Sequence, residues 1–137
     1  MMSEEEILEG NRLIAEFLQL ELNYKQVQFD NRIYYKTPFL PTIHAACEEQ
    51  FEFHKSLDWL QPVLDKIEDN WVEISIIGNR NMTGCDHKEY ECEIYTTGYQ
   101  CITQAHAASI NRVEAIYKAC IEYIKKYNTG TLKQPTK

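Results

Sequence analysis

Residues 56–68 carry a strong helical pattern of apolar and polar positions. Apolar residues recur there at the spacing of one helix face, namely Leu60, Val63, Leu64 and Ile67. Ser56 and Asp58 can each accept a hydrogen bond from the free N–H groups of a first turn. Pro62 lacks an N–H and crowds the carbonyl four residues earlier. We therefore expect regular winding to begin between Trp59 and Gln61, or the helix to enter with a kink.

Trp59 falls at the entrance of this helix, and two interpretations of it stay open. Its large apolar ring can anchor a core, provided that its N–H finds a partner. The ring can instead form one wall of a ligand site near a helix N-terminus.

Two further helical stripes stand near the ends of the chain. The first begins with Ser3 and Glu6, which have the spacing of a capping box, and continues with Ile7, Leu8, Ile14, Phe17 and Leu18. The second runs over residues 109–128, stops at Gly130, and presents the apolar residues Val113, Ile116, Tyr117, Cys120, Ile124 and Tyr127.

Between the helical stripe at residues 56–68 and the one at residues 109–128, the period of the apolar residues changes to two, which is typical of strands with one buried side. Residues 71–77, 89–97 and 99–103 are the expected strands, and residues 78–84 are an expected loop. Alternation in the first strand puts Val72, Ile74 and Ile76 opposite Trp71, Glu73 and Ser75, and in the second strand it puts Tyr90, Cys92 and Ile94 opposite Glu91, Glu93 and Tyr95. Short links favour pairing of sequential neighbours, so we predict an antiparallel meander.

These elements together predict an α+β fold, an α/β/α-type sandwich in which a small antiparallel three-stranded sheet packs with three helices. We expect a single domain over residues 1–130 and a disordered tail over residues 131–137.

Residues 23–53 lack regular periodicity and are rich in aromatic side chains. We expect a short strand at residues 32–36 and a short helical turn at residues 43–49. The aromatic rings could form a flap over the core, a subunit interface or a pocket. They are too many for a small monomer to cover easily, so we predict a homo-oligomer, most simply a dimer, with residues 24–53 in the contact.

Composition limits the classes of partner. The chain has 137 residues, of which 44% are hydrophobic and 26% charged, as in ordinary globular domains. No apolar run approaches a membrane span, and the acidic N-terminus is unlike a secretory signal, so we expect a cytoplasmic protein. A formal net charge of −7 argues against non-specific nucleic-acid binding.

Cysteine spacing argues against a metal centre. The chain has five cysteines and no Cys-x-x-Cys pair. A zinc site would have to gather Cys85, His87, Cys92 and Cys101, although Cys92 and Cys101 fall in strand-like runs where cysteine behaves as a small core residue. Whether Cys85, His87 and Cys92 approach one another is left open. We expect reduced thiols and no cofactor.

No catalytic arrangement is recognisable in the sequence. It contains no nucleophile elbow, no phosphate-binding loop, no zinc-protease motif and no dinucleotide fingerprint. His44, His54, His87 and His106 are scattered, and Cys85 and His87 have no fixed mutual geometry. We therefore do not expect an enzyme.

Three blocks carry a family resemblance: Asn-Arg-Leu-Ile-Ala-Glu-Phe-Leu at residues 11–18, Ser-Leu-Asp-Trp-Leu-Gln-Pro-Val-Leu-Asp-Lys-Ile-Glu at 56–68, and Arg-Val-Glu-Ala-Ile-Tyr-Lys-Ala-Cys-Ile-Glu-Tyr-Ile at 112–124. Their order resembles small proteins of bacteriophages and prophages related to the phage ABA (alpha/beta/alpha) sandwich domain. Leu57 stands where that family usually has the first tryptophan of its Trp-Asp-Trp, so only Trp59 of that pair remains.

The phage context implies a function in binding. We expect a non-catalytic phage accessory protein that binds and sequesters a small anionic, nucleotide-derived host immune signalling molecule. The expected pocket lies where residues 23–53 meet the N-terminal end of the Trp59 helix. The base of the bound molecule would stack on Tyr34, Tyr35 and Trp59, and its phosphates would contact Arg32, Lys36 and Arg80. The alternative is a phage interaction or assembly protein that acts through a protein interface, with no small-molecule ligand.

Overall fold

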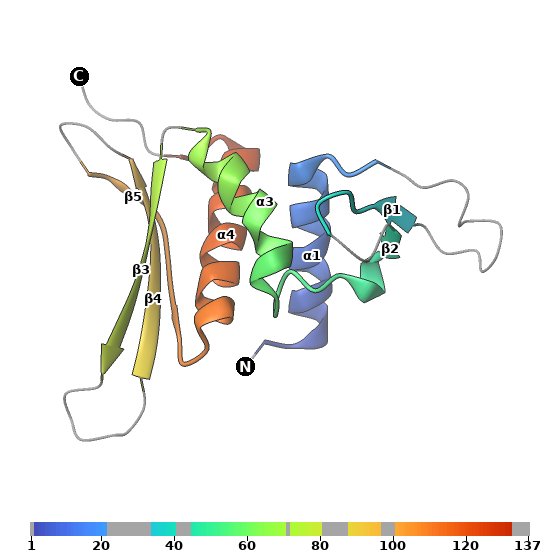
Figure 1. The fold of residues 1–137 in the computed structure, drawn as a ribbon. Helices are drawn as coiled ribbons and strands as arrows, with labels where there is room; N and C mark the ends of the chain where they lie inside the picture. Colours follow the sequence, from blue (N-terminus) through green and yellow to red (C-terminus); the bar gives the residue numbers. More distant parts are fainter. Residues whose placement is uncertain are drawn as a thin grey trace. The chain divides into compact units, whose positions relative to one another are not determined.

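A computed structural model of the chain describes residues 2–21, 34–40, 45–70, 72–80, 88–96 and 101–132. The chain divides into two compact units, Met1–Val63 and Leu64–Lys137, which are described separately. Three α-helices, a two-stranded sheet and a three-stranded sheet make up the described part of the chain (Figure 1). The predicted α+β class and the antiparallel sheet are confirmed. None of the described helices is long and apolar enough to cross a bilayer.

Helix α1 (Glu4–Leu18) is the first element of the first unit, and it begins directly after Ser3, the expected capping residue. The Ser3 hydroxyl accepts a hydrogen bond from the Glu6 N–H at 3.2 Å, which satisfies one of the free donors of the first turn. Ile14 and Phe17 are buried on the predicted apolar face. The helix ends at Gln19, whose φ of 55° lies in the left-handed region that closes many helices.

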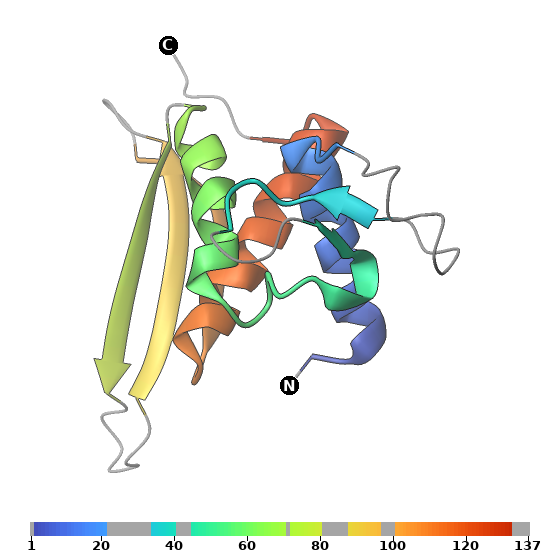
Figure 2. The same ribbon diagram turned by 45° about the vertical axis from the view of Figure 1, so that its right-hand side comes forward.

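A small two-stranded sheet follows α1 in the first unit. Strand β1 (Tyr34–Lys36) pairs antiparallel with β2 (Ala45–Cys47), and the 3-10 helix η1 (Glu48–Gln50) comes next (Figure 2). The strand expected at residues 32–36 is confirmed over its last three residues. The expected helical turn at residues 43–49 is wrong over β2, because residues 45–47 pair with β1.

Helix α3 (Leu57–Glu68) starts two residues before the expected position and contains Pro62. Its first turn closes with the Leu60 N–H donating to the Ser56 carbonyl at 3.2 Å. The N–H that Pro62 lacks would have bonded to the carbonyl of Asp58, an exposed residue that water can reach. The predicted apolar face is buried throughout, at Trp59, Leu60, Val63, Leu64 and Ile67.

Strands β3 (Val72–Arg80), β4 (Lys88–Thr96) and β5 (Thr103–Ser109) form the antiparallel sheet of the second unit in the order β3-β4-β5. The meander is as predicted, but two boundaries are wrong. Residues 78–80 extend β3 instead of forming a loop, since they pair with residues 88–90. The third strand covers Thr103–Ser109, because alanine-rich residues 105–108 pair with β4. Of the strand expected at residues 99–103, residues 101 and 102 precede β5, and residues 99 and 100 lie outside the described residues.

Helix α4 (Arg112–Thr129) packs against β4 and β5 and covers one face of this sheet (Figure 1). Cys92 and Ile94 of β4 and Ala105 of β5 are buried. Ala107 lies opposite Cys92, and Ala105 lies opposite Ile94. The small side chains of β5 leave room for α4 to pack against the sheet. This packing is a reason why the alanine-rich segment forms a strand, although alanine by itself favours a helix.

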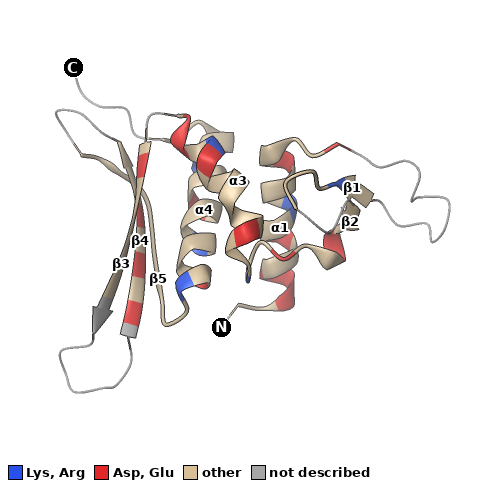
Figure 3. Cartoon of the chain, in the orientation of Figure 1, with Lys and Arg blue, Asp and Glu red and all other residues tan. Residues whose placement is uncertain are grey.

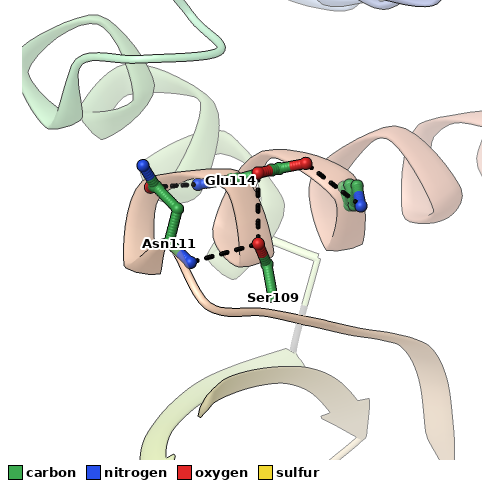
Figure 4. A network of polar contacts seen from close by, with 4 residues as sticks. Ser109, Asn111 and Glu114 are labelled. Carbon is green, nitrogen blue, oxygen red and sulfur yellow. Dashed lines mark hydrogen bonds and ion pairs between the residues drawn. The ribbon is translucent and has the colours of Figure 1, made fainter. Parts of the chain in front are cut away.

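The start of α4 is fixed by a polar network around Asn111 (Figure 4). The Asn111 side chain accepts from the Glu114 N–H, and the Ser109 hydroxyl donates to the Glu114 carboxylate, each at 3.1 Å. Lys118 lies 3.2 Å from the same carboxylate. Burial raises the pKa of Glu114, but hydrogen bonds from Lys118 and Ser109 outweigh it and lower that pKa. The helix expected from residue 109 therefore begins at Arg112, and Ser109 ends β5.

Candidate interaction surface

Trp59, the centre of the expected nucleotide site, is 2% exposed and lies in a cluster of aromatic rings. Its ring centroid is 5.1 Å from that of Phe53 and 5.9 Å from that of Phe51. Phe39 makes an edge contact with it at 5.9 Å. These are the tilted and edge-to-face geometries that aromatic rings prefer in a core. In this conformation the indole occupies the position of a core anchor.

The other predicted nucleotide-binding residues lie in different parts of the chain. Tyr34 and Tyr35 are half-buried neighbours on β1, so they point to opposite faces of the strand. The Lys36 ammonium lies 3.3 Å from the Glu21 carboxylate. Arg32 lies outside the described residues. Arg80 ends β3 in the second unit, and only its backbone is described.

Arg12 is a cation near the predicted site that the sequence pattern did not single out. Its guanidinium pairs with the Glu48 carboxylate at 3.2 Å and joins α1 to η1. Tyr35 lies close to this pair and contacts the ring of Phe51 at 5.7 Å. Burial raises the pKa of Tyr35, the charge of Glu48 raises it further, and the charge of Arg12 opposes them. A phosphate at Arg12 would have to share the guanidinium with Glu48.

A second polar contact joins α1 to the segment before α3. Asn11 is 1% exposed and donates to the Phe51 carbonyl at 3.3 Å, and its amide nitrogen lies 3.4 Å from Nδ1 of His54. Burial lowers the pKa of His54, and the charge of Lys55 lowers it further. His54 is therefore neutral at pH 7 and can accept from Asn11 through Nδ1. These contacts of Asn11 hold α1 to the segment before α3.

Most of the described cysteines are buried and do not gather as metal ligands do. Cys47, Cys92 and Cys120 are buried, and Cys101 is exposed. Burial raises the pKa of Cys92 to about 12, which leaves a thiol of low reactivity. Among the residues that the structure describes, no three His, Cys, Asp or Glu side chains come together as metal ligands do. Cys85 and His87, which a zinc site would have needed, lie outside the described residues.

The face of the sheet opposite α4 is a surface rich in carboxylates, which we call the open face. The register of the three strands places on it Glu73, Ser75 and Ile77 of β3, Glu89, Glu91, Glu93 and Tyr95 of β4, and Thr103, His106 and Ala108 of β5. All of these residues are exposed or half-exposed, and Ile77 is 48% exposed. Acidic residues recur along β4 (Figure 3).

Three of the carboxylates on the open face, those of Glu73, Glu91 and Glu93, lie beside a polar side chain of a neighbouring strand. The Tyr95 hydroxyl donates to Glu73 at 2.9 Å, and the Thr103 hydroxyl donates to Glu93 at 2.5 Å. His106 Nε2 lies 3.8 Å from the Glu91 carboxylate.

The hydrogen bond to Glu73 raises the pKa of Tyr95. These contacts fix the direction of the carboxylates and leave oxygen lone pairs for further donors.

The sequence pattern predicted part of the open face. Alternation correctly placed Glu73 and Ser75 of β3, and Glu91 and Glu93 of β4, opposite the apolar residues of their strands. The sequence pattern missed the contribution of β5. The third strand was expected to end at Thr103, and this boundary leaves His106 outside the predicted sheet.

Comparisons with protein-family models, with characterised proteins and with solved structures gave no match. The resemblance to the phage sandwich family, like the phage origin that it implies, therefore stays a prediction.

Proposed function

We propose that the protein is a non-catalytic binding protein that holds a cationic protein segment on the open face of the β3-β4-β5 sheet. The observation that carries this proposal is the set of Glu73, Glu91 and Glu93, three solvent-accessible carboxylates that each lie beside a polar side chain of another strand. No Lys or Arg is present among the described side chains of this face.

Electrostatics and packing both favour a cationic partner there. A single exposed ion pair contributes only about 0 to 1 kcal/mol, so several pairs on one surface are needed for useful affinity. Side chains that are already oriented lose less entropy when they bind. The exposed Ile77 and the ring of Tyr95 can pack against the aliphatic stems of lysine or arginine.

Capture of a small nucleotide-derived signal is the second candidate, in line with a phage accessory role. Its support is the adjacency of half-buried Tyr34 and Tyr35 to exposed Lys36 on β1. Trp59 could stack a base only if the aromatic cluster opened, and Lys36 would have to leave Glu21. The open face repels such an anion, so the two candidates predict different sites.

Calorimetric titration distinguishes the two candidates. An arginine-rich peptide should bind the wild type, and added salt should weaken the binding because the contact is electrostatic. The double variant Glu91→Gln, Glu93→Gln should weaken it about tenfold or more, which corresponds to about 1.4 kcal/mol. The matched control Glu4→Gln, Glu5→Gln removes the same charge from the first turn of α1 and should leave binding nearly unchanged.

Two results would contradict binding at the open face. One is the absence of peptide binding, and the other is an equal loss in the two double variants, which would indicate a general charge effect. Binding of a cyclic dinucleotide or an ADP-ribose derivative that is lost in Lys36→Ala would favour the second candidate.

A further inference from the structure

The β5 edge of the sheet is closed by two side chains of α4. The Glu122 carboxylate accepts from the backbone N–H of His106 at 3.1 Å. The Lys126 ammonium donates to the backbone carbonyl of Gln104 at 2.6 Å and lies 3.2 Å from Glu122. These contacts occupy backbone groups that would otherwise be available to another strand.

The opposite edge, β3, has no comparable closure by the residues that the structure describes. Strand β3 is nine residues long, and β4 is its hydrogen-bonded neighbour in the sheet. Among its described side chains, at residues 72–78, the single charge is Glu73. Proteins usually protect edge strands with lysine, proline, bulges or covering elements. A long strand rich in isoleucine without such protection is suited to pairing.

Incomplete burial of the isoleucines on β3 also points to a missing neighbour. Ile74 and Ile76 are half-buried on the face that α4 covers, and Ile77 is 48% exposed on the open face. In the central strand, Cys92 and Ile94 are fully buried at 0% exposure. A further strand beside β3 would remove more of this apolar surface from water.

We propose that β3 pairs antiparallel with β3 of a second copy of this chain, which makes a continuous six-stranded sheet. Full overlap of the nine residues centres the pair on Ile76. The proposal is independent of the ligand of the open face, although such a dimer would extend that face.

The sequence of β3 is self-complementary in this register. Ile74 of one copy lies opposite Gly78 of the other, so a large residue meets a small one, and Ser75 lies opposite Ile77. The two Glu73 residues are each six positions from the Glu73 of the other copy, about 20 Å along the strand. A parallel pair in register would instead place the two carboxylates side by side, where they repel.

Light scattering with two matched lysine variants tests this interface. Ile77 and Ala108 are both paired with Glu91, from opposite sides, so Ile77→Lys and Ala108→Lys add the same charge beside the same residue. The wild type should have twice the mass of the 16.2 kDa chain. Ile77→Lys should raise the dimer dissociation constant about tenfold or more, because lysine on an edge opposes pairing, and Ala108→Lys should not.

A cross-link tests the register, even if Ile77→Lys impairs folding. A mixture of Ser75→Cys chains and Ile77→Cys chains should form a disulfide between positions 75 and 77 of different copies, identified by peptide mass mapping. Neither variant alone should form a cross-link between two copies of its new cysteine as efficiently. A monomeric wild type, equal effects of the two lysine variants, or no cross-link between positions 75 and 77 would overturn the proposal.

Discussion

Glu73, Glu91 and Glu93 carry their charge on an exposed face, and each lies beside a polar side chain of a neighbouring strand. Exposed contacts of this kind contribute little to the free energy of unfolding. Their main effect is to orient the carboxylates, and the hydrogen bond to Glu73 also raises the pKa of Tyr95. Titration of Tyr95 is therefore a sensitive probe of the open face.

Tyr95 reports on its hydrogen bond to Glu73. That bond raises the pKa of Tyr95 above the ordinary value of 10.0, and burial contributes in the same direction. In Glu73→Gln the neighbouring negative charge is lost, so the pKa of Tyr95 should move down toward its ordinary value. Titration of the assigned Tyr95 ring resonances by NMR measures the change. An unchanged pKa in Glu73→Gln would show that the pair does not persist in solution.

His54 should make the stability of the protein depend on pH. Burial lowers its pKa below the ordinary value of 6.5, so between these two values the unfolded chain binds more protons than the folded chain. The contribution is fully present above pH 6.5 and is lost as pH falls through the lowered pKa. Protonation also prevents Nδ1 from accepting from Asn11.

Urea unfolding between about pH 7 and pH 5 measures this effect. The free energy of unfolding of the wild type should fall with pH, and His54→Gln should show a weaker fall. Equal slopes for the two proteins would rule out His54 as the cause.

At the scale of elements, the aromatic cluster holds the start of α3 to the segment that precedes it. Phe51 and Phe53 come from that segment, and both rings contact Trp59 in the first turn of the helix. Phe39, after β1, contacts the same ring. The expected role of the aromatic segment in a dimer stays a prediction, but these described rings already have partners within their own unit.

Removal of the Trp59 ring should therefore destabilise the fold. Trp59→Ala leaves a cavity among three aromatic rings, and we expect a loss of about 3 to 5 kcal/mol in the free energy of unfolding. Leu57→Ala is the matched control, since Leu57 lies on the same helix but is 39% exposed, and it should cost less than about 1 kcal/mol. Denaturant melts compare the two. A similar small cost for both variants would mean that Trp59 is not a core anchor.

The elements differed in how well the sequence predicted them. Helices α1 and α3 have strong periodicity, and the buried face of α3 follows the pattern. In α1, Ile14 and Phe17 are buried as predicted, but Leu8 is 40% exposed. The last strand was misplaced because alanine-rich residues 105–108 have no clear strand pattern, and they become a strand through pairing with β4. The start of α4 moved because Ser109 pairs in the sheet and Asn111 caps the helix.

Tertiary contacts decide which aromatic rings remain accessible. Spacing alone left Trp59 open to both a core and a ligand role, and its burial depends on rings from residues 39, 51 and 53. The open face depends on the alignment of three strands, which the alternation of one strand does not specify.

At the scale of the whole molecule, a formal net charge of −7 favours encounter with cationic partners. Net charge alone does not select a site. Selection requires a surface where oriented carboxylates and exposed apolar groups occur together, and the open face combines Glu91 and Glu93 with Ile77 and Tyr95. The central claim is therefore about where a ligand binds.

Mapping of amide chemical shifts by NMR tests this claim most directly. An arginine-rich peptide is titrated into the isotope-labelled protein, and a cyclic dinucleotide is titrated in a parallel experiment. The account predicts that the peptide causes its largest shifts at the amides of β3, β4 and β5, including Glu91, Glu93 and His106, and that the nucleotide leaves β1 unchanged. Peptide shifts that spare the sheet, or nucleotide shifts that centre on Tyr34, Tyr35 and Trp59, would contradict it.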